Sequence, residues 1–278
     1  MLLLLARDGN TFNKGDKVVW VGARTDLPLT AKGREQALAL GQALAPFAPR
    51  IKRVISGPLL RTREHAGILC DALKTPSPQP SPQGERESGC GPLVRGSGHF
   101  GGPFSQPHPL ADAATQGCKL AKASLRGEGQ DEGGLDPSPR ALPVIDERLR
   151  EIDYGLWEAK TSEEIQAMGG GAELDAWNKA GEWPRSPGWT PAPEAIAANV
   201  AELAGECAAG LGEGDAALLV TSNGIMKFFL KLVPGAFEDM AARGSLKVAT
   251  GHCCALRHSP RGWEVLFWDR EPGQIELG

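Results

Sequence analysis

The stretch MLLLLARDGNT, residues 1–11, is the starting point for interpreting the whole chain. Its apolar run, residues 2–6, is short and continuous, which is typical of a central strand in a parallel sheet. The run is too short for a signal peptide or a membrane span. It ends at Arg7 and Asp8, and Gly9 follows, so a polar loop begins where the strand stops. We therefore predict a buried strand that leads into a functional loop.

The residues that follow alternate between helical and strand patterns. Thr30 is a suitable N-cap for a helix whose apolar residues recur at helical spacing between residues 37 and 44. A strand is predicted at residues 51–56, and a Gly-Pro turn then opens a second helix, whose apolar positions lie within residues 59–73. The order strand, helix, strand, helix indicates an α/β fold.

A similar pattern resumes in the second half of the chain. Residues 194–211 have helical spacing, and residues 216–221 form another apolar strand. A helix-like run is expected at residues 225–232. The chain ends with predicted strands near residues 253–257 and 263–268.

Residues 74–140 interrupt this pattern with Pro, Gly, Ser, Gln and charged residues. Few apolar side chains are available there to offset the entropy of ordering. We predict a disordered, low-complexity insertion that contributes nothing to the core, with a partner-docking segment as the alternative. Residues 1–73 and 141–278 are then expected to form one domain.

The overall charge and the cysteines limit the classes of function. The 278 residues contain 30 Lys and Arg against 34 Asp and Glu, a net charge of -4, which provides no general attraction to nucleic acid or to an anionic membrane. The six cysteines form no CxxC pair and no zinc-like arrangement with the histidines. We expect a cytoplasmic protein with no metal, no cofactor and no nucleic-acid or membrane partner.

Charged and polar residues follow several of the predicted strands. Arg7 and Ser222 come at strand ends, Arg61 follows a strand-to-helix turn, and Glu151 lies in the segment between them. The ends of parallel strands form binding crevices. A guanidinium suits phosphate because its planar fork donates two hydrogen bonds and keeps its charge. These residues together indicate a phosphate-binding crevice.

The order and content of five segments resemble the histidine phosphatase superfamily, which is also called the phosphoglycerate-mutase-like family. That family has Arg-His-Gly-x-Thr, Asp-x-Pro-Leu-Thr-x-x-Gly, Ser-x-Pro-Leu-x-Arg-Thr, Leu-x-Glu-x-x-x-Gly-x-Trp-Glu and Val-Thr-His-x-Gly. The corresponding segments here are RDGNT at 7–11, DLPLTAKG at 26–33, SGPLLRT at 56–62, LREIDYGLWE at 149–158 and VTSNG at 220–224. The resemblance implies a three-layer α/β fold with a mostly parallel central sheet and helices on both faces.

The resemblance also assigns expected roles. Arg7 and Arg61 would bind the phosphate, and Glu151 would be the acid that protonates the leaving oxygen. The position of the family's nucleophilic histidine holds Asp8, and that of its second histidine holds Ser222.

Neither replacement has the chemistry of imidazole. A carboxylate at Asp8 would repel phosphate and could pair with Arg7 or Arg61. Ser222 donates one hydrogen bond but carries no charge, so it would stabilise a transferring phosphoryl group less than a protonated imidazole would. The leading hypothesis is therefore a catalytically impaired or inactive protein, a pseudophosphatase, that still binds a phosphorylated small molecule.

Two other interpretations stay open. One is an active phosphomonoester phosphatase or mutase that uses Asp8 or a rearranged histidine such as His65. The other is an altered copy of an active phosphatase, either decayed or deliberately mutated. Protein partners and the oligomeric state are left open. Three tryptophans in residues 161–193 would either contact a ligand or pack a lid; they are Trp177, Trp183 and Trp189.

Overall fold

The structure, a computed structural model, describes residues 1–74 and 143–277. The predicted disordered insertion, apart from Lys74, and residues 141 and 142 of the predicted domain lie outside the described residues. Lys74 ends helix α2. Within the part that is described, no helix is long and apolar enough to cross a membrane.

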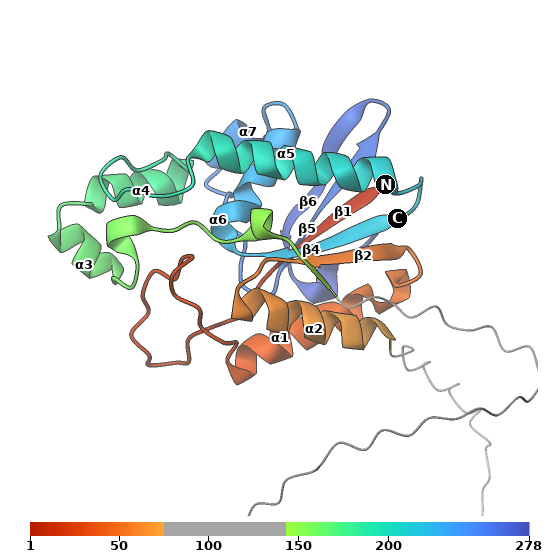
Figure 1. The fold of residues 1–278 in the computed structure, drawn as a ribbon, viewed down its shortest axis with the longest axis horizontal. Coiled ribbons are helices and arrows are strands. Elements are labelled where there is room, and N and C mark those ends of the chain that lie inside the picture. Colours follow the sequence, from red (N-terminus) through yellow and green to blue (C-terminus); the bar gives the residue numbers. More distant parts are fainter. Residues whose placement is uncertain (75–142, 278) are drawn as a thin grey trace, which may run out of the picture. The chain divides into compact units, whose positions relative to one another are not determined.

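The described residues contain a six-stranded sheet in the order β3-β2-β4-β1-β5-β6 (Figure 1). The strands β1 and β4, β4 and β2, and β2 and β3 pair in parallel, whereas β5 is antiparallel to both β1 and β6. The sheet is therefore mostly parallel, as predicted. The strands are β1 (Leu2–Arg7), β2 (Ile51–Ser56), β3 (Val144–Ile145), β4 (Ala216–Thr221), β5 (Cys253–Ser259) and β6 (Gly262–Arg270).

Helices cover both faces of the sheet, which confirms the three-layer α/β fold. Helices α1 and α2 lie against one face and α5 lies against the other (Figure 1). The α-helices are α1 (Ala31–Leu44), α2 (Leu60–Lys74), α3 (Ser162–Ala167), α4 (Gly171–Ala180), α5 (Pro193–Gly210), α6 (Asn223–Met226) and α7 (Ala236–Ala242). The 3-10 helices are η1 (Ala45–Phe47), η2 (Glu147–Leu149), η3 (Gly155–Trp157), η4 (Lys227–Leu232) and η5 (Pro272–Gln274).

Strand β1 is apolar along its length because its two sets of side chains enter two different cores. Leu2 and Leu4 pack in the cluster that contains the α1 and α2 side chains. Leu3 and Leu5 point to the opposite face and pack with the α5 side chains. Successive side chains of a strand point to opposite faces, so a strand covered on both faces needs apolar residues at every position. Burying each leucine contributes roughly 1.5–3 kcal/mol.

The helix that follows the first loop starts where the sequence predicts. The Thr30 side chain accepts a hydrogen bond of 3.1 Å from the N–H of Gly33, so Thr30 is the N-cap of α1. This cap fixes the position at which the chain leaves the loop. Close packing between the same loop and the helix leaves no room for a side chain at Gly9, whose Cβ would lie 2.4 Å from the Gly33 carbonyl oxygen.

Other elements differ in detail from the predicted ones. The helix-like run expected at residues 225–232 is divided into α6 and the 3-10 helix η4. The two C-terminal strands are each longer than predicted. The stretch from 161 to 193 contains α3 and α4. The longer strands differ from the prediction only at their ends, where element boundaries are least determined by local pattern.

Candidate functional site

The candidate site lies at the carboxyl ends of the central strands. Arg7 and Thr221 are register partners in β1 and β4, and the N–H of Asp8 donates a 3.1 Å hydrogen bond to the Thr221 carbonyl oxygen. Ser222 follows Thr221 and is the N-cap of α6. Helix α2 starts soon after β2 and places Arg61 in its first turn at the same edge. The parallel register therefore brings together residues that are far apart in the sequence.

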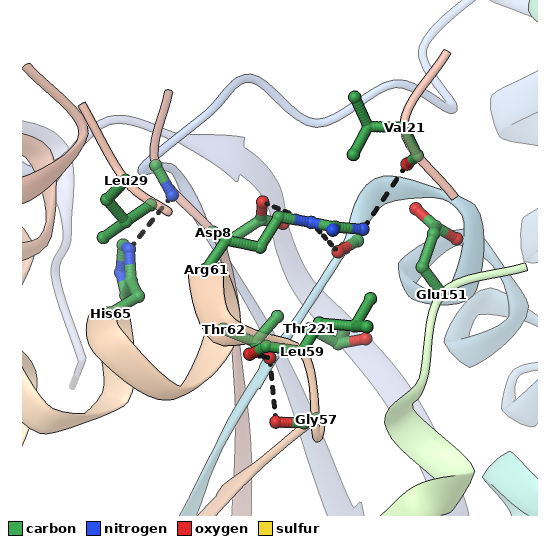
Figure 2. A network of polar contacts seen from close by, with 12 residues as sticks. Asp8, Val21, Leu29, Gly57, Leu59, Arg61, Thr62, His65, Glu151 and Thr221 are labelled. Atoms are coloured by element: carbon green, nitrogen blue, oxygen red, sulfur yellow. Dashed lines mark hydrogen bonds and ion pairs between the residues drawn. The ribbon is translucent and has the colours of Figure 1, made fainter. Parts of the chain in front are cut away.

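Asp8, Arg61 and Ser222 form a buried polar cluster. The Arg61 Nε lies 3.3 Å from the Asp8 Oδ2, and it donates a hydrogen bond of 3.3 Å to the Ser222 Oγ. Figure 2 shows the Arg61 guanidinium extending past Asp8. The Arg61 and Asp8 side chains are only 3% and 9% exposed, so water screens their attraction weakly.

Backbone carbonyl groups hold the other end of the Arg61 guanidinium. Its Nη1 donates to the Thr25 oxygen at 3.1 Å. Its Nη2 donates to the oxygens of Val21 and Gly22, both at 3.4 Å, and Figure 2 shows the first of these contacts. Arg61 is thus fixed in position, and the chain itself engages most of its donors.

The second arginine keeps more of its donors available. Arg7 is half-buried, and its Nη1 donates to the carbonyl oxygen of Val248. Its Nε is buried and has no hydrogen-bond partner among the described residues. A guanidinium has five N–H donors, and a buried donor without a partner is unfavourable. Arg7 therefore has a buried donor, its Nε, that no described residue engages.

Glu151 lies in the loop after η2 and is 4% exposed. Its Oε1 accepts a 2.9 Å hydrogen bond from its neighbour Ile152, and its Oε2 accepts one of 3.2 Å from the Gly224 N–H. Burial raises the pKa of the Glu151 carboxyl, although the positive charge of Arg61 and the two backbone hydrogen bonds oppose that effect. Such a carboxyl retains a proton more readily than an exposed glutamate, which suits a proton donor.

Three further residues belong to this region. His65 is fully buried, and its Nδ1 accepts a 3.1 Å hydrogen bond from the N–H of Gly9. Tyr154, the single tyrosine of the chain, is hydrogen-bonded to the Glu151 carboxyl and is buried. The position of His65, one helical turn after Arg61, indicated in the sequence that it could lie near the site. No local sequence pattern indicated that Tyr154 would lie there.

Lys227 is the third of these residues, and the sequence analysis did not single it out. Its side-chain ammonium lies 3.5 Å from the centre of the Trp177 ring, and the residue is 3% exposed. Burial lowers its pKa to about 7, an effect that Glu151 opposes and Arg7 reinforces. The single detectable signal was a lysine inside the apolar run that forms α6 and η4.

His252, His258 and the three tryptophans of residues 161–193 make their ion-pair and ring contacts with residues other than Asp8. His99 and His108 lie outside the described residues. His252 pairs with Asp269 at 2.9 Å, and the ring of His258 lies against Trp263. Trp177, Trp183 and Trp189 pack edge to face with one another in an aromatic cluster, and Trp177 and Trp189 are buried.

Glu151 also borders a cavity of about 340 Å³, whose lining includes Arg150, Asp153 and Thr190. Another cavity, of about 320 Å³, lies along β2, and its lining includes neither Asp8 nor Arg61. No group of three or more His, Cys, Asp or Glu side chains within residues 1–74 and 143–277 is arranged to hold a metal ion.

A comparison with sequence models of known families identifies the family of this chain. The sequence model of the histidine phosphatase superfamily (branch 1) matches residues 3–83 and 138–271. The chain therefore belongs to the histidine phosphatase superfamily. No curated protein matches the chain.

Solved structures with the same fold include several phosphatases. A mycobacterial glucosyl-3-phosphoglycerate phosphatase, solved with VO3, is 18% identical, with a TM-score of 0.59 over 96% of this chain and 98% of that one. An alpha-ribazole phosphatase from Shigella flexneri is 16% identical, with a TM-score of 0.58 and complete coverage of both chains, 100% each. A putative alpha-ribazole-5'-P phosphatase from Escherichia coli is 17% identical, with a TM-score of 0.57 over 98% of this chain and 97% of that one. At these identities the likeness concerns the fold.

Proposed function

We propose that this protein binds a phosphorylated small molecule at Arg7 and Arg61, with Glu151 at the acid position, and that it transfers phosphoryl groups very slowly or not at all. In this proposal Asp8 occupies the position of the nucleophilic histidine, and Ser222 occupies that of the second histidine. The observation that carries the proposal is the buried ion pair between Asp8 and Arg61 at 3.3 Å.

The ion pair bears on catalysis through charge. An arginine that faces only a phosphate stabilises the negative charge of the transition state. Here Asp8 already neutralises part of the Arg61 charge, and at this distance the attraction is on the order of a few kcal/mol. A phosphate dianion that approaches Arg61 also approaches the Asp8 carboxylate. Both effects raise the free energy of a phosphoryl-transfer transition state.

Ser222 further reduces the stabilisation of the transition state. Its hydroxyl accepts a hydrogen bond from the Arg61 Nε, so it is engaged with the same guanidinium. A hydroxyl carries no charge, whereas a protonated imidazole supplies a full positive charge and a strong donor.

His65 is a poor substitute nucleophile. Because its Nδ1 accepts from the Gly9 N–H, a neutral ring must carry its proton on Nε2. Burial lowers the His65 pKa to about 3, so the ring is neutral at physiological pH. One ring nitrogen is then occupied as an acceptor and the other carries a hydrogen, which leaves no free lone pair to attack phosphorus.

The test is to restore both histidines. We expect the natural protein to release phosphate from p-nitrophenyl phosphate no faster than an Arg61→Ala variant. The double variant Asp8→His with Ser222→His should gain activity by several orders of magnitude, with a trapped phosphohistidine at position 8. Each single variant should recover less, because nucleophile and stabilising group act as a unit.

Robust turnover by the natural protein would contradict the proposal. In that case trapping of phosphate on Asp8 would indicate an aspartyl intermediate, and activity that survives Asp8→Ala would indicate another nucleophile. A folded double variant that stays inactive would show that the pocket has lost more than its histidines.

A further inference from the structure

One oxygen of the Asp8 carboxylate has no partner within the described parts of the chain. The Oδ2 atom lies beside Arg61, but Oδ1 is buried and accepts no hydrogen bond from them. Asp8 as a whole is only 6% exposed. Buried polar atoms nearly always have a partner, because burial without one costs free energy. A ligand or a water molecule that reaches Oδ1 would supply the donor that the described residues do not.

The Arg7 Nε is the complementary case, a buried donor without a partner among the described residues. A ligand that satisfies both atoms must accept hydrogen bonds from a guanidinium and donate one to a carboxylate. An ionised carboxylate can only accept. A fully deprotonated phosphate or sulfate has only acceptor oxygens, so it would satisfy Arg7 and oppose Asp8. A phosphate monoanion has acceptor oxygens and also P–OH donors.

We infer that this pocket binds phosphate in its protonated, monoanionic form and excludes sulfate. This inference rests on the proposed phosphate-binding function. It specifies in addition which protonation state of the phosphate is bound. The P–OH group donates to the Asp8 carboxylate, so a repulsive contact between two oxygens becomes a short charge-assisted hydrogen bond. Sulfate has a similar shape but carries no proton at neutral pH, and the buried contact with Asp8 would remain unpaired.

Several other ionisable groups lie in this region. Their contribution to the pH dependence of anion binding must be distinguished from that of Asp8. Lys227, whose pKa burial lowers to about 7, loses its charge near neutral pH and would weaken the binding of any anion. The charged and titratable groups nearby come from β1, α2, the loop after η2, and η4; they are Arg7, Arg61, His65, Glu151, Tyr154 and Lys227.

Isothermal titration calorimetry of the full chain with inorganic phosphate and with sodium sulfate tests the inference. At about pH 7.5 we expect phosphate to bind at least about tenfold more tightly than sulfate, because tenfold corresponds to about 1.4 kcal/mol, which lies within the cost of leaving a buried polar group unpaired. Between about pH 7.5 and about pH 8.5 the phosphate affinity should fall roughly tenfold, in proportion to the fraction of monoanion.

The variant Asp8→Asn separates Asp8 from its neighbours. The carboxamide keeps an oxygen for Arg61 and adds a donor. We expect this variant to bind sulfate, and we expect its phosphate and sulfate affinities to have the same pH dependence. Sulfate does not titrate in this range, so it reports the contribution of Lys227 alone. Asp71→Asn, at a side chain that is 79% exposed on α2, is the matched control and should behave like the natural protein.

The comparison of two anions on the natural protein does not depend on the folding of any variant. Equal affinity for sulfate and phosphate would overturn the inference, and phosphate binding that does not weaken with rising pH would do the same. Continued exclusion of sulfate by a folded Asp8→Asn variant would also contradict it. Failure to bind either anion would overturn the phosphate pocket itself, so the two proposals fail in different ways.

Discussion

The N–H of Gly9 donates a 3.1 Å hydrogen bond to the Nδ1 of His65. Gly9 belongs to the loop after β1, and His65 lies in α2, so this bond joins the two segments that carry Asp8 and Arg61. The His65 ring is completely buried. The hydrogen bond that holds the Asp8 loop against the Arg61 helix therefore requires a neutral His65 ring, because a protonated ring has no acceptor nitrogen.

The first prediction concerns acid stability. Because burial lowers the His65 pKa to about 3, the unfolded chain takes up a proton as the pH falls below about 6.5, and the folded chain does not. The stability that His65 contributes is thus complete above this pH and is lost towards pH 3, at about 1.4 kcal/mol per pH unit. The variant His65→Asn keeps an acceptor for Gly9 but does not titrate.

We expect the free energy of urea unfolding to fall by about 2 kcal/mol more in the natural protein than in His65→Asn between about pH 7 and about pH 5. His258→Asn, a change at a ring on the β5 and β6 hairpin, should keep the natural pH dependence. Equal losses in the natural protein and His65→Asn would contradict the assignment.

The second prediction uses the single tyrosine. Burial raises the pKa of Tyr154 well above its usual value, and the nearby Glu151 carboxylate raises it further. Ionised phenol absorbs at about 295 nm, and we therefore expect the absorbance of the folded protein at this wavelength not to increase up to about pH 10. In guanidinium chloride the same group should titrate near pH 10. Ionisation near pH 10 with an unchanged near-UV circular dichroism spectrum would show that the hydroxyl is accessible.

The third prediction tests the close packing under Glu151. A Cβ at Gly224 would lie 2.2 Å from the Glu151 Oε1 and 2.8 Å from the Tyr154 hydroxyl. Gly224→Ala should therefore destabilise the protein by roughly 1–3 kcal/mol and displace the carboxyl. Gly205→Ala, in α5 with open space around it, should instead stabilise by up to about 1 kcal/mol. Similar effects of the two changes on urea unfolding would contradict this packing.

The fourth prediction concerns the buried ammonium of Lys227. Its pKa of about 7 means that the folded state binds fewer protons than the unfolded state between about pH 7 and about pH 10.5. The free energy of unfolding therefore rises with pH over this window. Burial of Lys227 destabilises the folded protein most at the low-pH end of the window. Lys227→Met should increase stability relative to the natural protein, and the gain should be roughly 2–3 kcal/mol smaller at about pH 9.5 than at about pH 7.

A matched control is available four residues later. Lys231 is exposed and lies 4.8 Å from the centre of the Phe237 ring, so Lys231→Met also removes a cation from an aromatic ring. We expect Lys231→Met to change stability by a similar amount at both pH values. A gain from Lys227→Met that does not vary with pH would show that the ammonium is not desolvated.

The sequence alone was sufficient to predict the central strands, whereas the roles of the candidate residues stay a prediction. The apolar runs at residues 51–56 and 216–221 correspond to β2 and β4 with the same bounds. Thr30 caps α1 as expected. These features are local, because alternation, capping and turn residues act over a few neighbouring positions. The order of the segments also indicated that Arg7, Arg61, Glu151 and Ser222 would meet at one edge, since parallel strands align their carboxyl ends.

Only the tertiary structure decided how those residues are paired. From the sequence, Asp8 could pair with Arg7 or Arg61; the ion pair is with Arg61, while the Arg7 Nε has no hydrogen-bond partner in residues 1–74 and 143–277. The capture of the Gly9 N–H by His65 and the burial of Lys227 against Trp177 were likewise decided by packing. Desolvation and side-chain direction depend on elements that arrive from distant parts of the chain, so they set the charge state of the pocket only after folding.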